Sequence, residues 1–141
     1  MRTSLSAPEI AARLRLSATR LARRLRQESN AGLSPSQQSA LAVIANHGPL
    51  TLGALAEHER VAPPSITKVV SKLESDGLVT RAPDPTDRRV CRVAISATGE
   101  ALLEESRRRK TAWLTERISQ LDADDQRRLA DALDVLDELI S

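Results

Sequence analysis

Apolar residues recur every three or four positions in two stretches near the ends of the chain. In residues 7–28 they are Ala11, Leu14, Ala18, Leu21 and Leu25. In residues 123–140 they are Leu129, Leu133, Leu136 and Ile140. A period close to 3.5 residues is typical of helices that pack along a narrow apolar seam. The pattern therefore predicts a helix with one apolar seam near each end of the chain.

The middle of the chain has shorter periodic runs separated by signals that start or stop a helix. Ser34 and Pro35, with Gln37 three residues after the serine, predict the start of a helix over residues 35–46. Thr51 is expected to cap a second helix over residues 52–58. After a turn, two prolines open a third helix, which ends near residue 76 before Gly77. The second and third of these helices, with the turn between them, predict a helix-turn-helix.

Two short alternating runs follow, over residues 78–82 and 90–95, and predict a β-hairpin. The loop between them, residues 83–89, is rich in turn-forming residues. Ser96 and Asp122 are then placed to cap long helices over residues 97–119 and 123–140. We therefore expect a mainly α fold with a small β-hairpin wing, in which a winged helix-turn-helix is flanked by N- and C-terminal dimerisation helices.

The same pattern divides the 141 residues into two regions of one intertwined domain. Residues 34–96 form the winged helix-turn-helix, and residues 1–30 with 97–141 form a helical dimerisation region. A helix-turn-helix places its second helix in the DNA major groove, and two-fold symmetry lets a pair of them read a palindrome. The alternative use of the two seams is to pack against each other within one chain.

Charge and composition narrow the function. Seven basic residues face four acidic ones in residues 60–92, which suits a polyanion, although arginine is abundant throughout. No apolar run approaches the ~18 residues of a membrane span and no signal peptide is present, so we expect a cytoplasmic protein that does not bind membranes. A single cysteine excludes an intramolecular disulfide and a cysteine-rich zinc site. We see no phosphate loop, metal cluster or nucleophile–base pair, and expect neither an enzyme nor a cofactor.

The third central helix and the hairpin loop supply the expected contacts to double-stranded DNA. Short hydroxyls and a lysine on the first two turns of the helix can reach base edges, while Lys72 is expected on a phosphate. In the loop, Arg89 is expected in a narrow minor groove, Arg88 on the backbone, and Asp87 paired with a hairpin arginine. The opposing interpretation is a solvated turn with a weak surface ion pair. The predicted DNA-binding residues are Pro64, Ser65, Thr67, Lys68, Ser71, Lys72, Asp87, Arg88 and Arg89.

These segments resemble the MarR (multiple antibiotic resistance regulator) family of winged-helix transcription factors. Asp87-Arg88-Arg89, followed after five residues by Ile95-Ser96, is similar to the family's wing signature. The stretch from Lys72 to Arg81 is similar to the end of its recognition helix and the entry to its wing. The resemblance covers about residues 8–140.

The resemblance implies a homodimeric transcriptional regulator, most often a repressor, that binds a palindromic operator. Many members release DNA when a small aromatic or phenolic compound binds between the dimerisation and DNA-binding parts. Two alternatives stay open: a DNA-binding protein that needs no ligand, and a winged-helix module for protein–protein interaction. The second would favour an acidic or apolar wing, whereas the outward residues here are Lys, Arg, Ser and Thr.

A few residues outside this interface have more than one interpretation. His47 and Trp113 are candidate contacts for an aromatic effector, although a surface role is equally consistent for His47, and a core or interface role is favoured for Trp113. His47 and His58 are eleven residues apart without acidic partners at metal-ligand spacing, so we expect no metal site. Cys91 alternates with Val93 and Ile95 and is expected to point inward as a small hydrophobe, not as a redox sensor.

Overall fold

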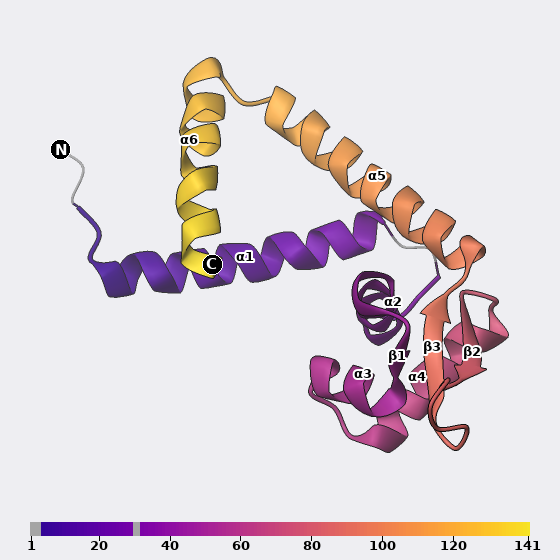
Figure 1. Cartoon of the computed structure of the whole chain (residues 1–141). Coiled ribbons are helices and arrows are strands. Elements are labelled where there is room, and N and C mark those ends of the chain that lie inside the picture. The colour runs from indigo at the N-terminus through magenta and orange to yellow at the C-terminus, as the bar shows by residue number, and fades with distance from the viewer. Residues whose placement is uncertain (1–3, 30–31) are drawn as a thin grey trace. The chain divides into compact units, whose positions relative to one another are not determined.

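The computed structural model describes residues 4–29 and 32–141 and divides the chain into two compact units, residues 29–107 and residues 1–28 with 108–141. Apart from the short strand β1, the elements follow the order that the sequence predicts (Figure 1). They are α1 (Ala7–Glu28), α2 (Pro35–His47), β1 (Leu50–Thr51), α3 (Leu52–Glu59), α4 (Pro63–Ser75), β2 (Val79–Pro83), β3 (Cys91–Ile95), α5 (Ala97–Ser119) and α6 (Ala123–Ile140). The mainly α fold with a small β wing is confirmed, and the ends of the predicted elements lie within one residue of those observed.

The helix starts that the sequence predicts have the expected caps. Ser34 and Gln37 form a capping box, in which each side chain accepts a hydrogen bond from the other residue's backbone N–H. Thr51 accepts from the Ala54 amide at the start of α3, and Asp122 accepts from the Asp125 amide at the start of α6. These side chains satisfy backbone donors that have no partner within their helix, and this is why the elements begin where they do.

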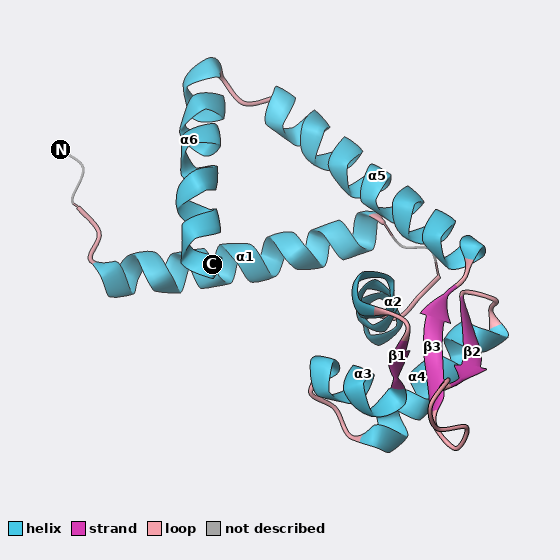
Figure 2. Ribbon diagram, viewed as in Figure 1, coloured by secondary structure: helices cyan, strands magenta, loops and turns pink. Residues whose placement is uncertain are grey.

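The sheet is antiparallel and has the strand order β1-β3-β2 (Figure 2). Strands β2 and β3 form the wing, with Arg81 opposite Val93 and Pro83 opposite Cys91. Strand β1 pairs Leu50 with Val93 and joins the start of α3 to the wing. The sequence predicts the hairpin but not β1, because two residues are too few to show an alternating pattern.

The unit of residues 29–107 has a continuous aliphatic core beneath α2, α3, α4 and the sheet. Its fully buried members include Leu41 from α2, Leu55 from α3 and Val70 from α4. The other core residues are Ala40, Ile44, Leu50, Ala56, Ile66, Leu73, Leu78, Val79 and Val93. Because each of the three helices contributes one apolar face to this core, the opposite face of α4 is left outward.

The end of α4 and the start of α5 are joined through the wing. Gly77 has φ +75°, a left-handed conformation that favours glycine and ends α4. Ser96 donates to the Gly77 carbonyl at 2.6 Å and accepts from the Gly99 amide at 3.0 Å, so one hydroxyl caps α5 and holds the end of α4. A Cβ at Gly99 would meet the Leu78 carbonyl, which explains a buried glycine in the first turn of α5.

The unit of residues 1–28 and 108–141 contains α1, the second half of α5, and α6. None of its described residues is buried. The seams predicted from the sequence are partly covered at Leu14, Leu25 and Leu136, and exposed at Leu21 and Leu133. This unit is therefore helical without an internal core of its own.

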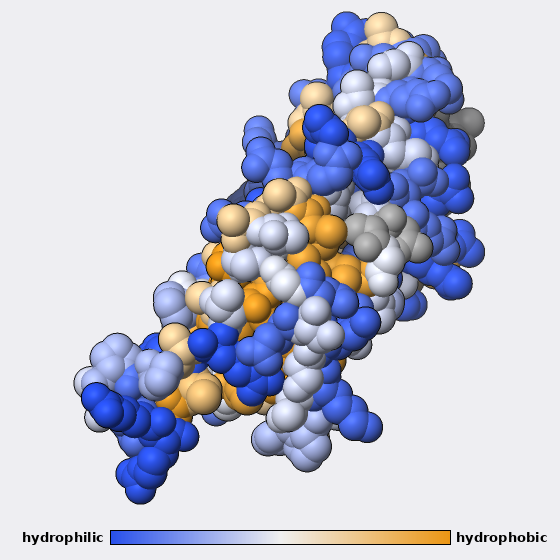
Figure 3. Space-filling model, turned by 90° about the vertical axis from the view of Figure 1, so that its right-hand side faces the viewer, coloured by the Kyte–Doolittle hydropathy of each residue, from blue (hydrophilic) through white to orange (hydrophobic). Residues whose placement is uncertain are grey.

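Most of the face drawn in Figure 3 is hydrophilic, with apolar side chains reaching the surface among charged ones. Within the described residues, no helix is both long and apolar enough to cross a lipid bilayer.

Candidate nucleic-acid interface

Helix α4 presents the six residues that the sequence assigns to it as DNA contacts. Its inner face buries Ile66, Val70 and Leu73, with Val69 half-buried beside them. The side chains on the other face are all exposed, namely Pro64, Ser65, Thr67, Lys68, Ser71 and Lys72. Because buried and exposed residues alternate with helical periodicity, the six residues lie on the part of the helix that faces away from the core.

The start of α4 has few backbone donors to offer an anion. Its N-cap residue, Ala62, provides no side-chain cap, and Pro63 and Pro64 have no N–H group. The next amide, that of Ser65, already donates to the Ala62 carbonyl at 3.0 Å. Side chains, chiefly the lysines, are therefore the groups of this helix start that could contact a phosphate.

Several polar side chains of α4 are already paired. Thr67 donates its hydroxyl proton to the Pro63 carbonyl at 3.0 Å, and Lys72 forms an ion pair with Asp76 at 3.3 Å. Both members of the Lys72 pair are substantially exposed, so the pair is weak and leaves the ammonium available to a phosphate. Ser71 accepts a hydrogen bond from Arg81 on β2 at 3.3 Å, which joins the helix to the wing.

Asp84 organises the wing loop, where the sequence alone indicates no more than a turn former. One of its oxygens accepts from the Thr86 amide at 2.8 Å, the Thr86 hydroxyl at 2.7 Å and the Asp87 amide at 3.3 Å. The other oxygen accepts from Arg92 on β3 at 2.6 Å. Arg92 also donates to the Pro49 carbonyl at 3.5 Å, so the same network reaches the loop before α3.

This carboxylate is buried, with 8% of its side chain exposed, but it stays charged. The hydrogen bond from the Thr86 hydroxyl, then the one from the Thr86 amide, and then Arg92 hold the pKa of Asp84 well below its usual range. In the sequence, an aspartate two residues before a threonine indicates the turn but not the arginine that faces it from β3.

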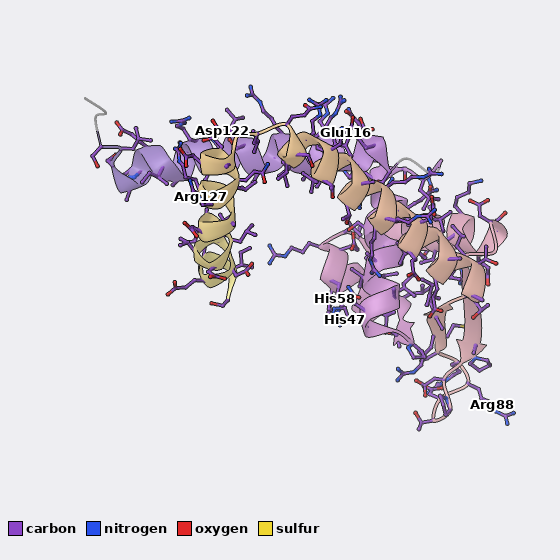
Figure 4. The ribbon with its side chains drawn as sticks, turned by 90° about the horizontal axis from the view of Figure 1, so that it is seen from above. His47, His58, Arg88, Glu116, Asp122 and Arg127 are labelled. Atoms are coloured by element: carbon purple, nitrogen blue, oxygen red, sulfur yellow. The ribbon has the colours of Figure 1, made fainter. Side chains whose placement is uncertain are left out.

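Asp87 pairs with a hairpin arginine, as predicted, and that arginine is Arg89. Its carboxylate accepts from the Arg89 amide at 3.1 Å and from the guanidinium at 3.2 and 3.4 Å. The Arg89 side chain is 90% exposed, so this ion pair is a weak surface contact, and most of the side chain faces solvent. Arg88 extends from the tip of the wing in Figure 4.

The wing is thus built in three steps, each of which fixes the next. Asp84 and Arg92 join the two strands, the Asp84 oxygen holds the backbone at Asp87, and Asp87 then holds Arg89. The arrangement presents two exposed guanidiniums on a loop whose shape is set by a buried charge. Such cations suit phosphates or a narrow minor groove.

The two candidate effector residues belong to different compact units. The ring of His47 stacks on that of His58, with centroids 4.5 Å apart and planes at 23°, and Figure 4 shows the two side by side. Packing of α2 against α3 creates this contact. A separation of eleven residues in the sequence does not predict it. Trp113 lies under two guanidiniums, Arg24 at 5.5 Å and Arg117 at 5.1 Å from its ring centroid. These are cation–π distances, and they explain how a lone indole is held in a unit without a core.

A cleft of about 250 Å³ lies beside the end of α2, within the unit of residues 29–107. It is lined by Ala45, Asn46, Glu100, Leu103, Glu104 and Arg107. No sequence pattern indicates this cleft, because its two walls come from helices more than fifty residues apart.

The expectation that Cys91 points into the core is wrong, because its side chain is exposed. It is the first residue of β3 and pairs with Pro83, at the end of the wing that extends beyond the core, whereas Val93 two residues later is fully buried. Alternation therefore predicts which side of β3 a residue lies on, but it does not predict where along the strand the buried core ends. Among residues 4–29 and 32–141, no group of three or more His, Cys, Asp or Glu side chains is placed to hold a metal ion.

Comparison with known proteins places this architecture in one family. The MarR family model matches residues 33–91, which contain α2 to α4, β2 and the wing loop up to the start of β3. An HTH-type transcriptional regulator of Mycobacterium leprae is 43% identical over 132 residues, covering 93% of this chain and 92% of the relative.

Solved structures agree with this assignment. A transcriptional regulator of Thermotoga maritima has a TM-score of 0.80 at 29% identity and covers 93% of each chain. A mutant of the Staphylococcus aureus protein MepR, solved bound to an oligodeoxyribonucleotide, shares the fold with a TM-score of 0.73 at 16% identity, over 98% of this chain and 100% of that one. The chain belongs to the MarR family of transcriptional regulators.

Proposed function

We propose that this regulator is a repressor that binds a pseudo-palindromic operator as a homodimer, and that a small aromatic ligand releases it. In each subunit, α4 enters a major groove and the wing reaches the adjacent minor groove. The observation that supports this most directly is the pairing of an exposed polar face on α4 with a preorganised arginine wing in one compact unit. The oligonucleotide complex of MepR, which has the same fold, is consistent with this mode of binding.

The residues divide by role. Ser65, Thr67 and Ser71 face base edges, Lys68 reaches guanine or a phosphate, and Lys72 contacts a phosphate. Arg89 enters the minor groove, held by Asp87, while Arg88 contacts the backbone and Pro64 lies close to the DNA at the helix start. The outward side chains are cationic or hydroxylated, which favours DNA over a protein partner.

The proposed dimer follows from the terminal helices. Leu21 on α1 and Leu129, Leu133 and Ile140 on α6 belong to apolar seams, yet all of them are exposed in a single chain. Seams of period 3.5 are buried by another helix. A second copy of the same chain would cover them and would supply the two-fold symmetry that a palindrome requires.

The proposed effector site is the cleft beside the end of α2. The cleft between α2 and α5 has a volume of about 250 Å³, and we place a single aromatic ring there. Arg107 is the lining cation that would pair with a carboxylate or phenolate. His47 lies next in sequence to Asn46 of the lining, whereas Trp113 is a separate candidate contact that does not belong to this cleft.

Binding selection followed by titration tests the proposal. The full chain is incubated with random duplexes, the bound sequences are recovered, and affinity and stoichiometry are measured on the consensus site. We expect an inverted repeat bound by two chains, and a decrease in affinity on adding aromatic acids, with a change in emission from Trp113, the only aromatic residue. A non-repeated site bound by one chain would overturn the dimeric operator, and affinity unchanged by every aromatic acid would favour the ligand-independent alternative.

A further inference from the structure

Two hydroxyl side chains lie one helical turn apart on the exposed face of α4. Thr67 and Ser71 are four residues apart, so they are neighbours on one face of the helix. A hydroxyl has one proton to donate and two lone pairs that accept. What each side chain offers to DNA therefore depends on which of these the protein already uses.

The proton of Thr67 is used within the helix. Its Oγ1 donates to the Pro63 carbonyl at 3.0 Å, the bond from residue i to residue i−4 that threonine commonly makes in helices. With its proton engaged, the outward side of Thr67 consists of lone pairs and a methyl group. Thr67 therefore faces solvent as a hydrogen-bond acceptor.

Ser71 is in the opposite situation. Its Oγ accepts from the Nη2 of Arg81 at 3.3 Å, and a guanidinium has donors only. One lone pair of Ser71 is thus occupied, and within the described residues no hydrogen bond uses its proton. Ser71, unlike Thr67, therefore has a proton to donate to a base.

The position of Arg81 is itself fixed. Its Nε lies 3.3 Å from the Glu74 carboxylate, and three quarters of its side chain is shielded from solvent. The Nε atom is buried and makes no well-directed hydrogen bond, so the contact with Glu74 is ionic. Glu74 and the β2 backbone together hold the guanidinium against Ser71.

We infer that Thr67 and Ser71 read bases with opposite hydrogen-bond polarity, Thr67 as an acceptor and Ser71 as a donor that Arg81 keeps in this role. The inference rests on the proposed function, because it concerns α4 in a major groove. Arg81 is a positioning residue, which acts on DNA through Ser71.

The polarity restricts the operator. In the major groove, donors are the amino groups of adenine and cytosine, while acceptors are purine N7, guanine O6 and thymine O4. Thr67 should therefore select adenine or cytosine, and Ser71 a purine or thymine. Four residues of helix span about 6 Å and base pairs stack about 3.4 Å apart, so the two selected positions should lie within about two base pairs.

Base analogues in the selected operator test each polarity separately. Purine lacking the 6-amino group, or pyrimidinone lacking the 4-amino group, removes the donor opposite Thr67. A 7-deazapurine removes the acceptor opposite Ser71, with 4-thiothymine as the weaker acceptor where the base is thymine. Each change should weaken the unmodified protein about threefold to tenfold, the usual effect of one hydrogen bond.

Variants then show which side chain makes each bond. Thr67→Val keeps the methyl group and loses the acceptor, so amino removal should no longer weaken binding by this variant, while acceptor removal still should. For Ser71→Ala, acceptor removal should no longer weaken binding, while amino removal still should. Thr19→Val is the matched control, because Thr19 makes the same i−4 hydrogen bond in α1, to the Arg15 carbonyl at 2.9 Å.

The role of Arg81 is tested by its effect on discrimination between the unmodified operator and the base analogues, and not only by its effect on affinity. Arg81→Met should abolish the effect of acceptor removal at the Ser71 position and leave the effect of amino removal at Thr67, and Arg81→Lys, which retains a donor, should restore part of it. A merely structural role would weaken all operators equally and lower the melting temperature.

Three results would overturn the inference. The first is that Thr67→Val couples to the acceptor analogue, or Ser71→Ala to the amino analogue. The second is that specific binding is retained and neither variant couples to any analogue. The third is that the unmodified protein selects no sequence, which would overturn the proposed function itself and is visible before any variant is made.

Discussion

The two compact units of this chain differ in how their apolar residues are used. In residues 29–107, Leu41 and Leu55 are fully buried and three helices share one core. In the terminal helices, Leu133 is 52% exposed and Ile140 is 84% exposed, although both belong to a seam as regular as any in the chain. Regular periodicity therefore predicts a face that packs but does not say whether its partner is the same chain.

This difference separates two kinds of stability. The winged unit gains hydrophobic stabilisation within one chain, so its stability should not depend on protein concentration. If the terminal helices pack against a second copy, their stability should rise with concentration, as it does for dimers. Substitutions in the two units should then differ in how much stability they remove and in whether that loss depends on protein concentration.

The largest effect should come from a charge in the terminal seam. Burying one leucine contributes about 1.5–3 kcal/mol, and a two-fold dimer contains each position twice, so Leu133→Asp should weaken association by about 3–6 kcal/mol. Sedimentation equilibrium measures this directly. Ala130→Asp adds the same charge on the same helix off the seam and should leave the dimer largely intact; equal dissociation by both variants, or by neither, would contradict the assignment.

The next effect should come from the core of the winged unit. Leu41→Ala leaves a cavity under α2 and should lower the free energy of unfolding by about 2–5 kcal/mol. Urea denaturation at two protein concentrations should give the same loss at both. Leu139→Ala, at a residue 66% exposed, should cost about 0.5 kcal/mol or less, and a loss from it that exceeds the loss from Leu41→Ala would reverse the comparison.

Within the winged unit, Arg89→Ala should weaken operator binding by about 1–3 kcal/mol, because it removes the exposed guanidinium that is proposed to enter the minor groove. Arg88→Ala should cost less and affect all sequences similarly, as expected for a backbone contact. Fluorescence anisotropy on the selected operator, at matched salt and with the fold checked by circular dichroism, measures both. Equal affinity of Arg89→Ala and wild type would remove Arg89 from the minor groove.

Lys72→Ala should have a smaller and less specific effect. Removing one phosphate contact reduces the slope of log affinity against log salt by about 0.9, and every sequence should be weakened alike. Lys110→Ala in α5 changes charge equally outside the interface and should leave the slope unchanged. A loss of affinity confined to the selected operator would show that Lys72 reads a base.

The sequence predicts most of the fold because its signals are local. Capping residues, prolines and Gly77 mark where helices start and end, and these need only a few neighbouring residues to act. What it does not predict depends on packing between distant segments. The pairing of β1 with β3, the stacking of His47 on His58 and the cleft beside α2 all join residues whose separation has no characteristic period.

The candidate interface shows the same division. The outward face of α4 follows from helical periodicity, and the pairing of Asp87 with Arg89 follows from their adjacency. Neither the contact of Arg81 with Ser71 nor the exposure of Cys91 could be predicted, because each depends on where the wing sits relative to the core. The role of Asp84 could not be predicted either, because a loop aspartate ordinarily faces solvent, and only the structure shows the arginine opposite it.

Asp84 allows the contribution of the wing to be measured through pH. Its folded pKa lies below the ordinary value near 3.8, so its charge stabilises the folded wing above that pH, and this contribution is lost as the pH falls further and the carboxylate is protonated. Asp84→Asn keeps an acceptor for Thr86 but not the charge that Arg92 faces. At neutral pH the variant should already lack this contribution, and it should therefore lose less stability than wild type between about pH 5 and pH 2. Urea denaturation across this range measures it, with Asp131→Asn on α6 compared to account for the change in net charge. Parallel profiles for wild type and Asp84→Asn would mean that the buried carboxylate does not stabilise the wing.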